Sequence, residues 1–484
     1  MIDNSNIKPK VISALFWKLM ERGGTQGIQF IVQIILARLL LPEDYGTIAL
    51  IVVFINIANL FVNSGFTTAL IQKKDADETD FNSVFYMSSF IAIMLYIILF
   101  FTAPIIAGFY EDPLLVPVLR VLSIMILVGV YTSIQNTIVS KKLQFKKSFI
   151  SSILSGVLSG SVGIVMAYLN FGVWALVAQQ LLSQVMFTVT MLLIVKWKPK
   201  FLYSSKRVKK LFSYSWKLLV SNIIDTLDSN LSSLIIGKIS NSTMLGFYSR
   251  GASFPSLIVE NINGSIQSVM LPALSSQQDD INKVKNMVRR SITTSSFLIF
   301  PMMVGLAVVA KPLVIVILTE KWLDAVPFLQ IFCLVYAFWP IHTANLQAIN
   351  ALGRSDIFLK LEIIKKIIGI SILLISIRYG VYAIALSSTF SGIVSLFINT
   401  YPNKKLLDYG IKEQMLDILP SMIIALLMGV IVYSISFFNL SVWLTLIMQI
   451  LSGIVIYMGT AYLLKLECLE YLFSTARELL AARR

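Results

Sequence analysis

The chain has 484 residues, of which 57% are hydrophobic and only 13% carry a charge. Together with a mean hydropathy of +0.80, this composition excludes an ordinary water-soluble protein and is typical of membrane proteins. The net charge of +15 would also suit a nucleic-acid-binding protein, so the positions of the basic residues decide what that charge means.

Apolar runs of roughly 20 residues predict about fourteen transmembrane helices. The polar segment 1–10 precedes a run that is too long for a cleaved signal peptide, so we expect that run to be retained as the first helix. No stretch between the runs is long enough for a separate soluble domain. We therefore predict an all-α polytopic membrane protein. Its expected helices span 11–41, 44–70, 81–108, 117–140, 148–169, 173–195, 212–237, 243–273, 287–310, 325–351, 357–377, 381–401, 415–437 and 441–464.

Basic residues lie mainly in alternate loops between these helices. The loops on the side of the N-terminus hold most of the 40 Lys and Arg residues, with the largest group in the connector 196–211. By the positive-inside rule this bias predicts that both termini are cytoplasmic. It also supports the helix count, because one missed helix would invert the alternation further along the chain. Membrane topology, and not nucleic-acid binding, therefore explains the charge. The opposite side has only Arg38, Arg120, Lys238, Lys311, Lys321 and Arg378.

The chain repeats itself at a distance of about 200 residues. Trp17 in FWKLMERGGTQ corresponds to Trp216 in YSWKLLVSNIIDTL, and Gly46 in EDYGTIAL corresponds to Gly246 in MLGFYSRG. Two pseudo-symmetric lobes of six helices with the same orientation follow, as in transporters that open alternately to either side of a membrane. The expected parts are a cytoplasmic N-terminus (1–10), an N-terminal six-helix lobe (11–195), a basic cytoplasmic linker (196–211), a C-terminal six-helix lobe (212–401), helices 13 and 14 (402–464) and a basic cytoplasmic tail (465–484).

Polar residues inside the predicted helices are the candidates for function. A charge at mid-bilayer costs at least ~2.5 kcal/mol and is retained where it faces a cavity or a partner. On the first helix such residues recur every three or four positions and form one stripe, and the repeat aligns Asp225 of the seventh helix with Gln26 of the first. We expect these faces to line a wet cavity between the lobes. The candidate lining residues are Lys18, Arg22, Gln26, Gln29, Asn56, Asn59, Arg250 and Asn263, with Glu21, Asp225 and Glu260 as acidic members.

Several of these residues have a structural alternative. Glu21 with Arg22, and Asp225 with Arg250, can equally form ion pairs that lock helices together. Lys18 lies near the cytoplasmic end of its helix and can extend to the membrane interface.

Two further polar sites on the tenth and eleventh helices favour structural roles. Lys365 and Lys366 follow Glu362, and an internal ion pair or extension to the interface is favoured over substrate contact. His342 is the only histidine, and a hydrogen-bonded packing role is favoured over a proton relay.

Residues for catalysis or metal binding form no recognisable constellation. Cys333 and Cys468 lie far apart in sequence and give neither a disulfide framework nor metal-ligand spacing. Gly156, Gly160 and Gly163 predict close helix packing, since no strand precedes them as in a phosphate-binding loop. We therefore expect neither an enzyme nor a bound metal or cofactor.

The segments 36–75 (LARLLLPEDYGTIALIVVFINIANLFVNSGFTTALIQKKD) and 235–275 (IIGKISNSTMLGFYSRGASFPSLIVENINGSIQSVMLPALS) resemble bacterial polysaccharide transporters. These are the Wzx-type flippases of the multidrug/oligosaccharidyl-lipid/polysaccharide (MOP) exporter superfamily. The resemblance covers helices 1 to 12 and rests on L-x-P-x-D-Y-G, followed by L-G-x-Y and a later P-A-L-S. It is strongest for the lipopolysaccharide and exopolysaccharide branch.

The resemblance implies two six-helix bundles of the MATE/MOP type in the bacterial inner membrane. It implies translocation of an undecaprenyl-pyrophosphate-linked oligosaccharide from the cytoplasmic to the periplasmic leaflet by alternating access. Lys18, Arg22 and Arg250 suit the cationic positions that hold the pyrophosphate in this family, and Asn and Gln side chains suit sugar hydroxyls. The intramembrane carboxylates are then candidates for coupling to H⁺ or Na⁺. The implied partners are the lipid-linked oligosaccharide, membrane lipid, and a polysaccharide polymerase with its export machinery.

Three other functions remain open. A multidrug antiporter of the same fold is expected to have a more acidic and aromatic cavity for cationic drugs, and a peptidoglycan-precursor flippase is a further relative with fourteen helices. A membrane enzyme that transfers or polymerises sugars should have a large external loop with several Arg and His, whereas the external loops here are short. A scaffolding role is hard to reconcile with polar stripes in both lobes.

Overall fold

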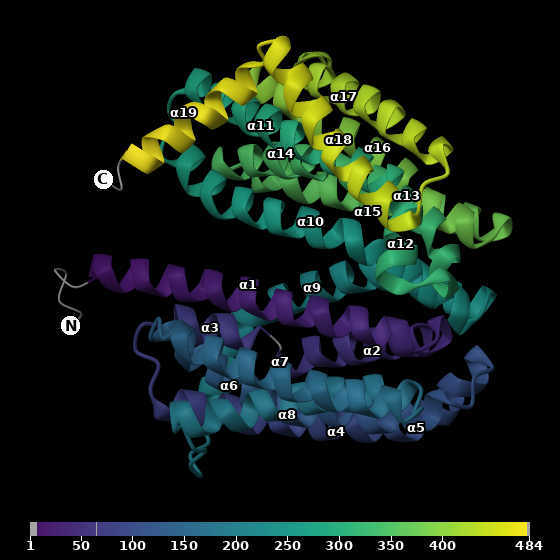
Figure 1. The fold of residues 1–484 in the computed structure, drawn as a ribbon. Helices are drawn as coiled ribbons and strands as arrows, with labels where there is room; N and C mark the ends of the chain where they lie inside the picture. The colour runs from purple at the N-terminus through teal and green to yellow at the C-terminus, as the bar shows by residue number, and fades with distance from the viewer. Residues whose placement is uncertain (1–6, 64, 482–484) are drawn as a thin grey trace. The chain divides into compact units, whose positions relative to one another are not determined.

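The computed structural model describes residues 7–63 and 65–481. Over these residues every regular element is a helix and no strand occurs (Figure 1). Each of the fourteen predicted segments falls mainly within one to three consecutive helices. The all-α fold class is therefore confirmed.

Ten of the described helical segments are long and apolar enough to cross a membrane, so the chain is a multi-pass membrane protein. The four other predicted segments are also helical but more polar, which is why length and composition alone do not count them. They are α1 (Ile7–Leu39), α9 (Ser205–Ile239), α10 (Ser242–Ser275) and α15 (Ser355–Ser376).

The chain divides by its internal contacts into two compact units, Met1–Gly246 and Phe247–Arg484. The boundary falls inside α10, so α9 belongs to the first unit. The repeat instead predicts two lobes that are separated by the linker 196–211. The symmetry of these two lobes stays a prediction. The last seven residues of the expected linker 196–211 are already helical, because α9 begins at Ser205.

Glycines allow the helices of the first unit to pack closely. α7 packs along both α1 and α8. A Cβ atom on Gly160 would lie 2.4 Å from the side chain of Val32, and one on Gly163 would lie 2.8 Å from Gln179. The predicted close packing of this helix is confirmed. The other helices of this unit are α2 (Pro42–Asn63), α3 (Phe66–Gln72), α4 (Glu78–Tyr110), α5 (Leu115–Leu122), α6 (Ile124–Lys141), α7 (Phe145–Tyr168) and α8 (Val173–Val195).

Some predicted helices are interrupted. The segment 44–70 is divided into α2 and α3, and Gly65 between them has a φ of 67°, a conformation that glycine adopts without strain. The segment 117–140 is divided into α5 and α6 at Ser123. Each of these two segments is still a single candidate membrane span, but helical periodicity in an apolar run does not reveal the short break within it.

The first turns of α2 and α10 meet at two glycines. A Cβ atom on Gly46 would lie 1.6 Å from the carbonyl oxygen of Ser242, and one on Gly246 would lie 2.0 Å from that of Pro42. The repeat spacing relates Gly46 to Gly246 and Pro42 to Ser242, so the two contacts are reciprocal, as in an isologous interface. Only glycine permits this backbone approach.

The second unit is held together by buried amides as well as by apolar packing. The side chains of Asn345 and Gln414 exchange two hydrogen bonds of 2.9 Å, and Asn403 donates a third of 2.6 Å to Asn345. All three side chains are buried, and they join α14, α16 and α17. The helices after α10 are α11 (Ile281–Val308), α12 (Ala310–Leu318), α13 (Val326–Ala337), α14 (Trp339–Ala351), α15, α16 (Val381–Leu407), α17 (Ile411–Ser434), α18 (Val442–Leu463) and α19 (Glu467–Ala481).

The expected C-terminal tail contains the helix α19. It packs against α11, and the guanidinium of Arg290 lies 3.4 Å from the ring centre of Tyr471. Beside this contact a cavity of about 470 Å³ is lined by residues of α11, α17 and α19. Both signs of charge line it, since Arg289 donates a 2.6 Å bond to Asp417.

Candidate functional site

The polar stripe of α1 lies beside the face that packs on α7. Ile28 and Val32 contact α7, and Gln29 of the stripe follows Ile28 by one residue, or about 100° around the helix. Lys18 and Glu21 form an ion pair of 2.9 Å, in which the lysine is 56% exposed and the glutamate 16%. The structure thus gives Glu21 a basic partner one turn before it. Arg22 and Gln29 are exposed and Gln26 is half-buried.

The asparagines of α2 point in different directions. Asn56 is exposed and Asn59 is half-buried, and the side-chain oxygen of Asn59 would lie 3.6 Å from a Cβ atom on Gly129 of α6. Asn63 accepts a 2.8 Å bond from the hydroxyl of Ser133. Part of the predicted stripe therefore belongs to a polar interior of the first unit.

This interior includes residues that the sequence interpretation did not select. Gln184 of α8 donates a 2.9 Å bond to Thr132 of α6, and Thr132 lies 2.5 Å from the hydroxyl of Thr188. Hydrogen bonds between membrane helices contribute roughly 1 kcal/mol each. These residues hold the helices behind the candidate lining face.

The remaining candidates lie on α9 and α10. Asp225 and Glu260 are exposed. Arg250 is half-buried, with its guanidinium 5.8 Å from the ring centre of Trp322. Asn263 is 6% exposed, and its side-chain oxygen has no hydrogen-bond donor among the described residues. A shared cavity lined by these residues together with those of α1 and α2 stays a prediction.

The hydrogen bonds expected for the two structural alternatives in the second unit are present. Lys365 donates a 2.6 Å bond to Glu362, so this lysine is part of an internal pair. The Nδ1 atom of His342 lies 3.2 Å from the side-chain amide of Asn399, as expected for a hydrogen-bonded packing role.

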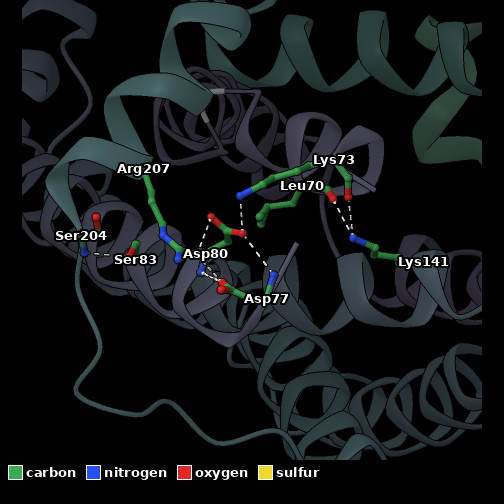
Figure 2. A network of polar contacts seen from close by, with 8 residues as sticks. All are labelled: Leu70, Lys73, Asp77, Asp80, Ser83, Lys141, Ser204 and Arg207. Atoms are coloured by element: carbon green, nitrogen blue, oxygen red, sulfur yellow. Dashed lines mark hydrogen bonds and ion pairs between the residues drawn. The ribbon is translucent and has the colours of Figure 1, made fainter. Parts of the chain in front are cut away.

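A cluster of ion pairs surrounds the start of α4 (Figure 2). Asp77 and Asp80 form a capping box, in which each side chain accepts a hydrogen bond from the backbone of the other. Asp80 is fully buried, and its carboxylate lies 2.6 Å from Lys73 and 3.5 Å from Arg207. Arg207 also donates a 2.5 Å bond to Asp77. We call these four residues, with Lys141, the α4 cap cluster.

The fifth member of the α4 cap cluster closes the end of α3. Lys141 donates hydrogen bonds to the backbone oxygens of Leu70 and Lys73, where a cation complements the carbonyl end of a helix. The arginine of this cluster holds the pKa of the Asp77 carboxyl down, at about 2. The carboxylate is therefore fully charged at neutral pH.

The same region fixes the chain that leads into α9. Lys200 donates a 2.5 Å bond to Glu78, and its backbone nitrogen donates to Asn82 at 2.6 Å. The backbone nitrogen of Ser204 donates a 2.9 Å bond to Ser83. The connector is thus bound to α4 of the first unit along its length.

The sequence interpretation missed the α4 cap cluster because it treated Lys73 and Arg207 only as markers of topology. The spacing D-x-x-D at Asp77 and Asp80, directly before an apolar run, is a capping signal. That signal predicts a helix start, but it does not identify the distant arginine that pairs with it.

Residues 35–327 match the sequence profile described as polysaccharide biosynthesis protein. This match covers more than half of the chain. The chain belongs to the polysaccharide biosynthesis protein family. The resemblance found in the sequence is therefore confirmed at the level of the family.

Relatives of this family member come from several bacteria. The succinoglycan biosynthesis transport protein ExoT of Rhizobium meliloti is 24% identical over 318 residues, which cover 66% of this chain and 64% of that protein. The teichuronic acid biosynthesis protein TuaB of Bacillus subtilis is 24% identical over 62% of each chain. The chain thus spans less than two thirds of the length of these two relatives. The lipopolysaccharide biosynthesis protein WzxC of Escherichia coli is 22% identical over 82% of this chain and 80% of that protein.

Solved structures share the fold of this family member. The lipid II flippase MurJ, in an inward closed conformation, superimposes with a TM-score of 0.75 at 17% identity and covers 93% of this chain and 99% of its own. An inward-facing multidrug resistance transporter of the MATE family, in the MOP superfamily, gives a TM-score of 0.60 at 15% identity over 79% of this chain. The expected MATE/MOP-type fold is therefore confirmed.

Proposed function

We propose that the protein is a flippase that moves an undecaprenyl-pyrophosphate-linked oligosaccharide from the cytoplasmic to the periplasmic leaflet of the bacterial inner membrane by alternating access. The observation that carries this proposal is the fold shared with the lipid II flippase over nearly the whole of both chains, in a member of the polysaccharide biosynthesis protein family. On this proposal both termini are cytoplasmic, and the protein transports and does not catalyse.

The head group of such a substrate needs matching charges inside the membrane. A pyrophosphate that enters a low-dielectric region requires cations and hydrogen-bond donors. Lys18 and Arg22 on α1 and Arg250 on α10 suit this role, and the amides Gln26 and Gln29 suit sugar hydroxyls. Arg22 and Gln29 are exposed on a helix face that is not used for packing on α7, which favours a contact role.

The lipid chain of the substrate needs an apolar path. In the second unit α11, α12, α17 and α18 surround a cavity of about 430 Å³ whose lining is almost wholly apolar, with Gln449 among the few polar side chains. An isoprenoid chain suits such a surface, because burial of apolar area is favourable.

Coupling to an ion gradient is part of the proposal. Asp225 and Glu260 are carboxylates on long, otherwise largely uncharged stretches of α9 and α10, and they suit H⁺ or Na⁺ exchange. Glu21 is the third candidate, and because it pairs with Lys18 at 2.9 Å, proton binding to Glu21 would neutralise this carboxylate and free the lysine. We also propose a polysaccharide polymerase and its export machinery as functional partners.

The multidrug antiporter is the second candidate, because the MATE transporter has the same fold. The basic residues Lys18, Arg22 and Arg250 speak against it, since cationic drugs favour acidic and aromatic surroundings.

Deleting the gene tests the proposed function. The lipid-linked oligosaccharide should accumulate on the cytoplasmic leaflet, and the purified protein in liposomes should expose it to a lectin on the opposite side. Arg22→Gln should slow this transfer about tenfold or more, because a hydrogen bond to a charged group contributes roughly 1.5–3 kcal/mol. Arg38→Gln, at the other end of α1, is the matched control and should transfer normally. If the deletion strain accumulates no intermediate, the protein is not this flippase.

A further inference from the structure

A pocket lined by cations lies beside the α4 cap cluster in the first unit. Its volume is about 280 Å³, and its lining comes from α3 with the residue after it and from the first turns of α9. Half of its lining residues are basic and none is acidic. The lining residues are Ala69, Gln72, Lys73, Arg207, Lys210 and Leu211.

Two of these cations are held in place from behind. Figure 2 shows Lys73 and Arg207 reaching toward the carboxylates of Asp80 and Asp77. Among the described residues Arg207 forms its ion pairs with Asp77 and Asp80 through Nη1, so the other donors of its guanidinium remain for a ligand. The carboxylates of Asp80, which is buried, and Asp77, which is half exposed, thus orient the cations without lining the pocket.

The third cation has no such partner. Lys210 lies one turn after Arg207 on α9 and is exposed, and no ion pair of its ammonium group is found among the described residues. Near the pocket, the cations Lys73, Arg207, Lys141 and Lys210 outnumber the carboxylates of Asp77 and Asp80. The pocket therefore has an excess of positive charge. The electrostatic surroundings therefore favour an anion.

The floor of the pocket is closely packed. Ala69 and Leu211 are buried, and Gly65, which precedes α3, would place a Cβ atom 3.0 Å from Ser215 of α9. Lys141 covers the carbonyl end of α3 at 2.7 Å from the backbone oxygen of Lys73, so this helix end does not repel an anion. A preformed site loses little entropy on binding.

The size of the pocket limits its ligand. Sites for drug-sized molecules have volumes of roughly 300–1,000 Å³, so a cavity of about 280 Å³ suits a phosphate or diphosphate group and not a whole oligosaccharide. Arginine and lysine together are the usual ligands of such groups, the arginine as a planar fork and the lysines as point charges.

We propose that Lys73, Arg207 and Lys210 bind the phosphate or diphosphate head group of a membrane lipid on the side where the basic loops gather. The proposal deepens the proposed function and rests on it for one point, that the substrate begins on this side. The pocket then captures the head group of the lipid-linked sugar before it reaches the polar faces of α1 and α10. An acidic phospholipid carries the same chemistry and is the second source.

Binding to the full-length protein in phosphatidylcholine nanodiscs tests the pocket without requiring transport. Three probes are titrated and followed by native mass spectrometry: undecaprenyl diphosphate, phosphatidylglycerol and free inorganic pyrophosphate, with undecaprenol as the lipid without phosphate. Lys210→Gln should weaken lipid binding about tenfold, as expected for one charge-assisted contact. Lys206→Gln, the same change one turn earlier on the exposed surface of α9, is the matched control and should leave binding unchanged.

Each outcome decides the proposal. A Lys210-dependent preference for undecaprenyl diphosphate supports it with the substrate as the source, and the same preference for phosphatidylglycerol supports it with bulk lipid as the source. Equal weakening by Lys206→Gln and Lys210→Gln, or binding of undecaprenol as tight as that of its diphosphate, overturns it. Binding of free pyrophosphate without lipid preference overturns the lipid assignment.

Lys73→Gln and Arg207→Gln disturb the cap of α4, so their thermal unfolding is measured alongside binding. A variant that unfolds like the parent but loses the lipid supports the site. The flippase proposal can fail separately. In that case the protein still binds the lipid but transfers no oligosaccharide.

Discussion

Asp77 is half exposed, yet its ionisation is strongly affected by one neighbour. The hydrogen bond from Arg207 is the largest cause of its lowered pKa, about 2 against an ordinary 3.8. A carboxyl whose pKa is lower in the folded state stabilises that state above its unfolded pKa, and the contribution disappears as the pH falls toward the folded value. Asp77 therefore stabilises the cap of α4 at neutral pH.

Asp77→Asn should lower the thermal stability of the detergent-solubilised protein at pH 7. The difference in melting temperature between parent and variant should be constant above about pH 5 and should shrink as the pH falls from about 4 to 2, because the parent loses its charge there. Glu43→Gln, an exposed acid in the first turn of α2, serves as the control. A difference that grows toward low pH would contradict the assigned cause.

At the scale of elements, sequence periodicity predicts where the helices are but not what fixes their ends. Apolar runs were sufficient for every predicted segment, because a membrane helix satisfies its own backbone. The break at Gly65 and the capping of α4 by Arg207 were not predicted. The first depends on backbone conformation within an apolar run, and the second on two residues about 130 positions apart.

The helix α19 was expected only as a basic tail. Its amphipathic face is attached through Tyr471, on which the guanidinium of Arg290 lies at 3.4 Å, and a contact of this kind contributes roughly 0.5–2 kcal/mol. Tyr471→Ala should therefore speed amide hydrogen exchange across 467–481 about two- to thirtyfold without changing exchange in α11. Phe473→Ala removes a ring that is 53% exposed and should have little effect. Equal exchange in both variants would show that other contacts hold α19.

At the scale of the whole molecule, the sequence repeat predicts equivalent polar faces on α1 and α9, and both helices belong to the first unit. Arg22 and Gln29 are exposed as expected for lining residues, whereas Asn59 and Asn263 are partly or wholly buried. Three- and four-residue spacing places residues on one face of a helix, but it does not determine which neighbouring helix covers that face. The exposure of candidate residues near the packed edge of a stripe was therefore the hardest property to predict from the sequence.

The repeat also predicts that Gly46 and Gly246 are equivalent, and the reciprocal backbone contacts of α2 and α10 give this equivalence a physical test. A Cβ atom at either position would lie within 2.0 Å of a backbone oxygen, so the helix starts must separate to admit it. Gly46→Ala and Gly246→Ala should each lower the free energy of unfolding by at least about 1–3 kcal/mol. The double variant should lose less than the sum, because one separation relieves both clashes. Gly108→Ala in α4, where nothing lies within 4 Å of the added atom, should be neutral or stabilising by up to about 1 kcal/mol. Melting temperatures in detergent check all four variants, and additive losses would mean that the two glycines do not belong to one crossing.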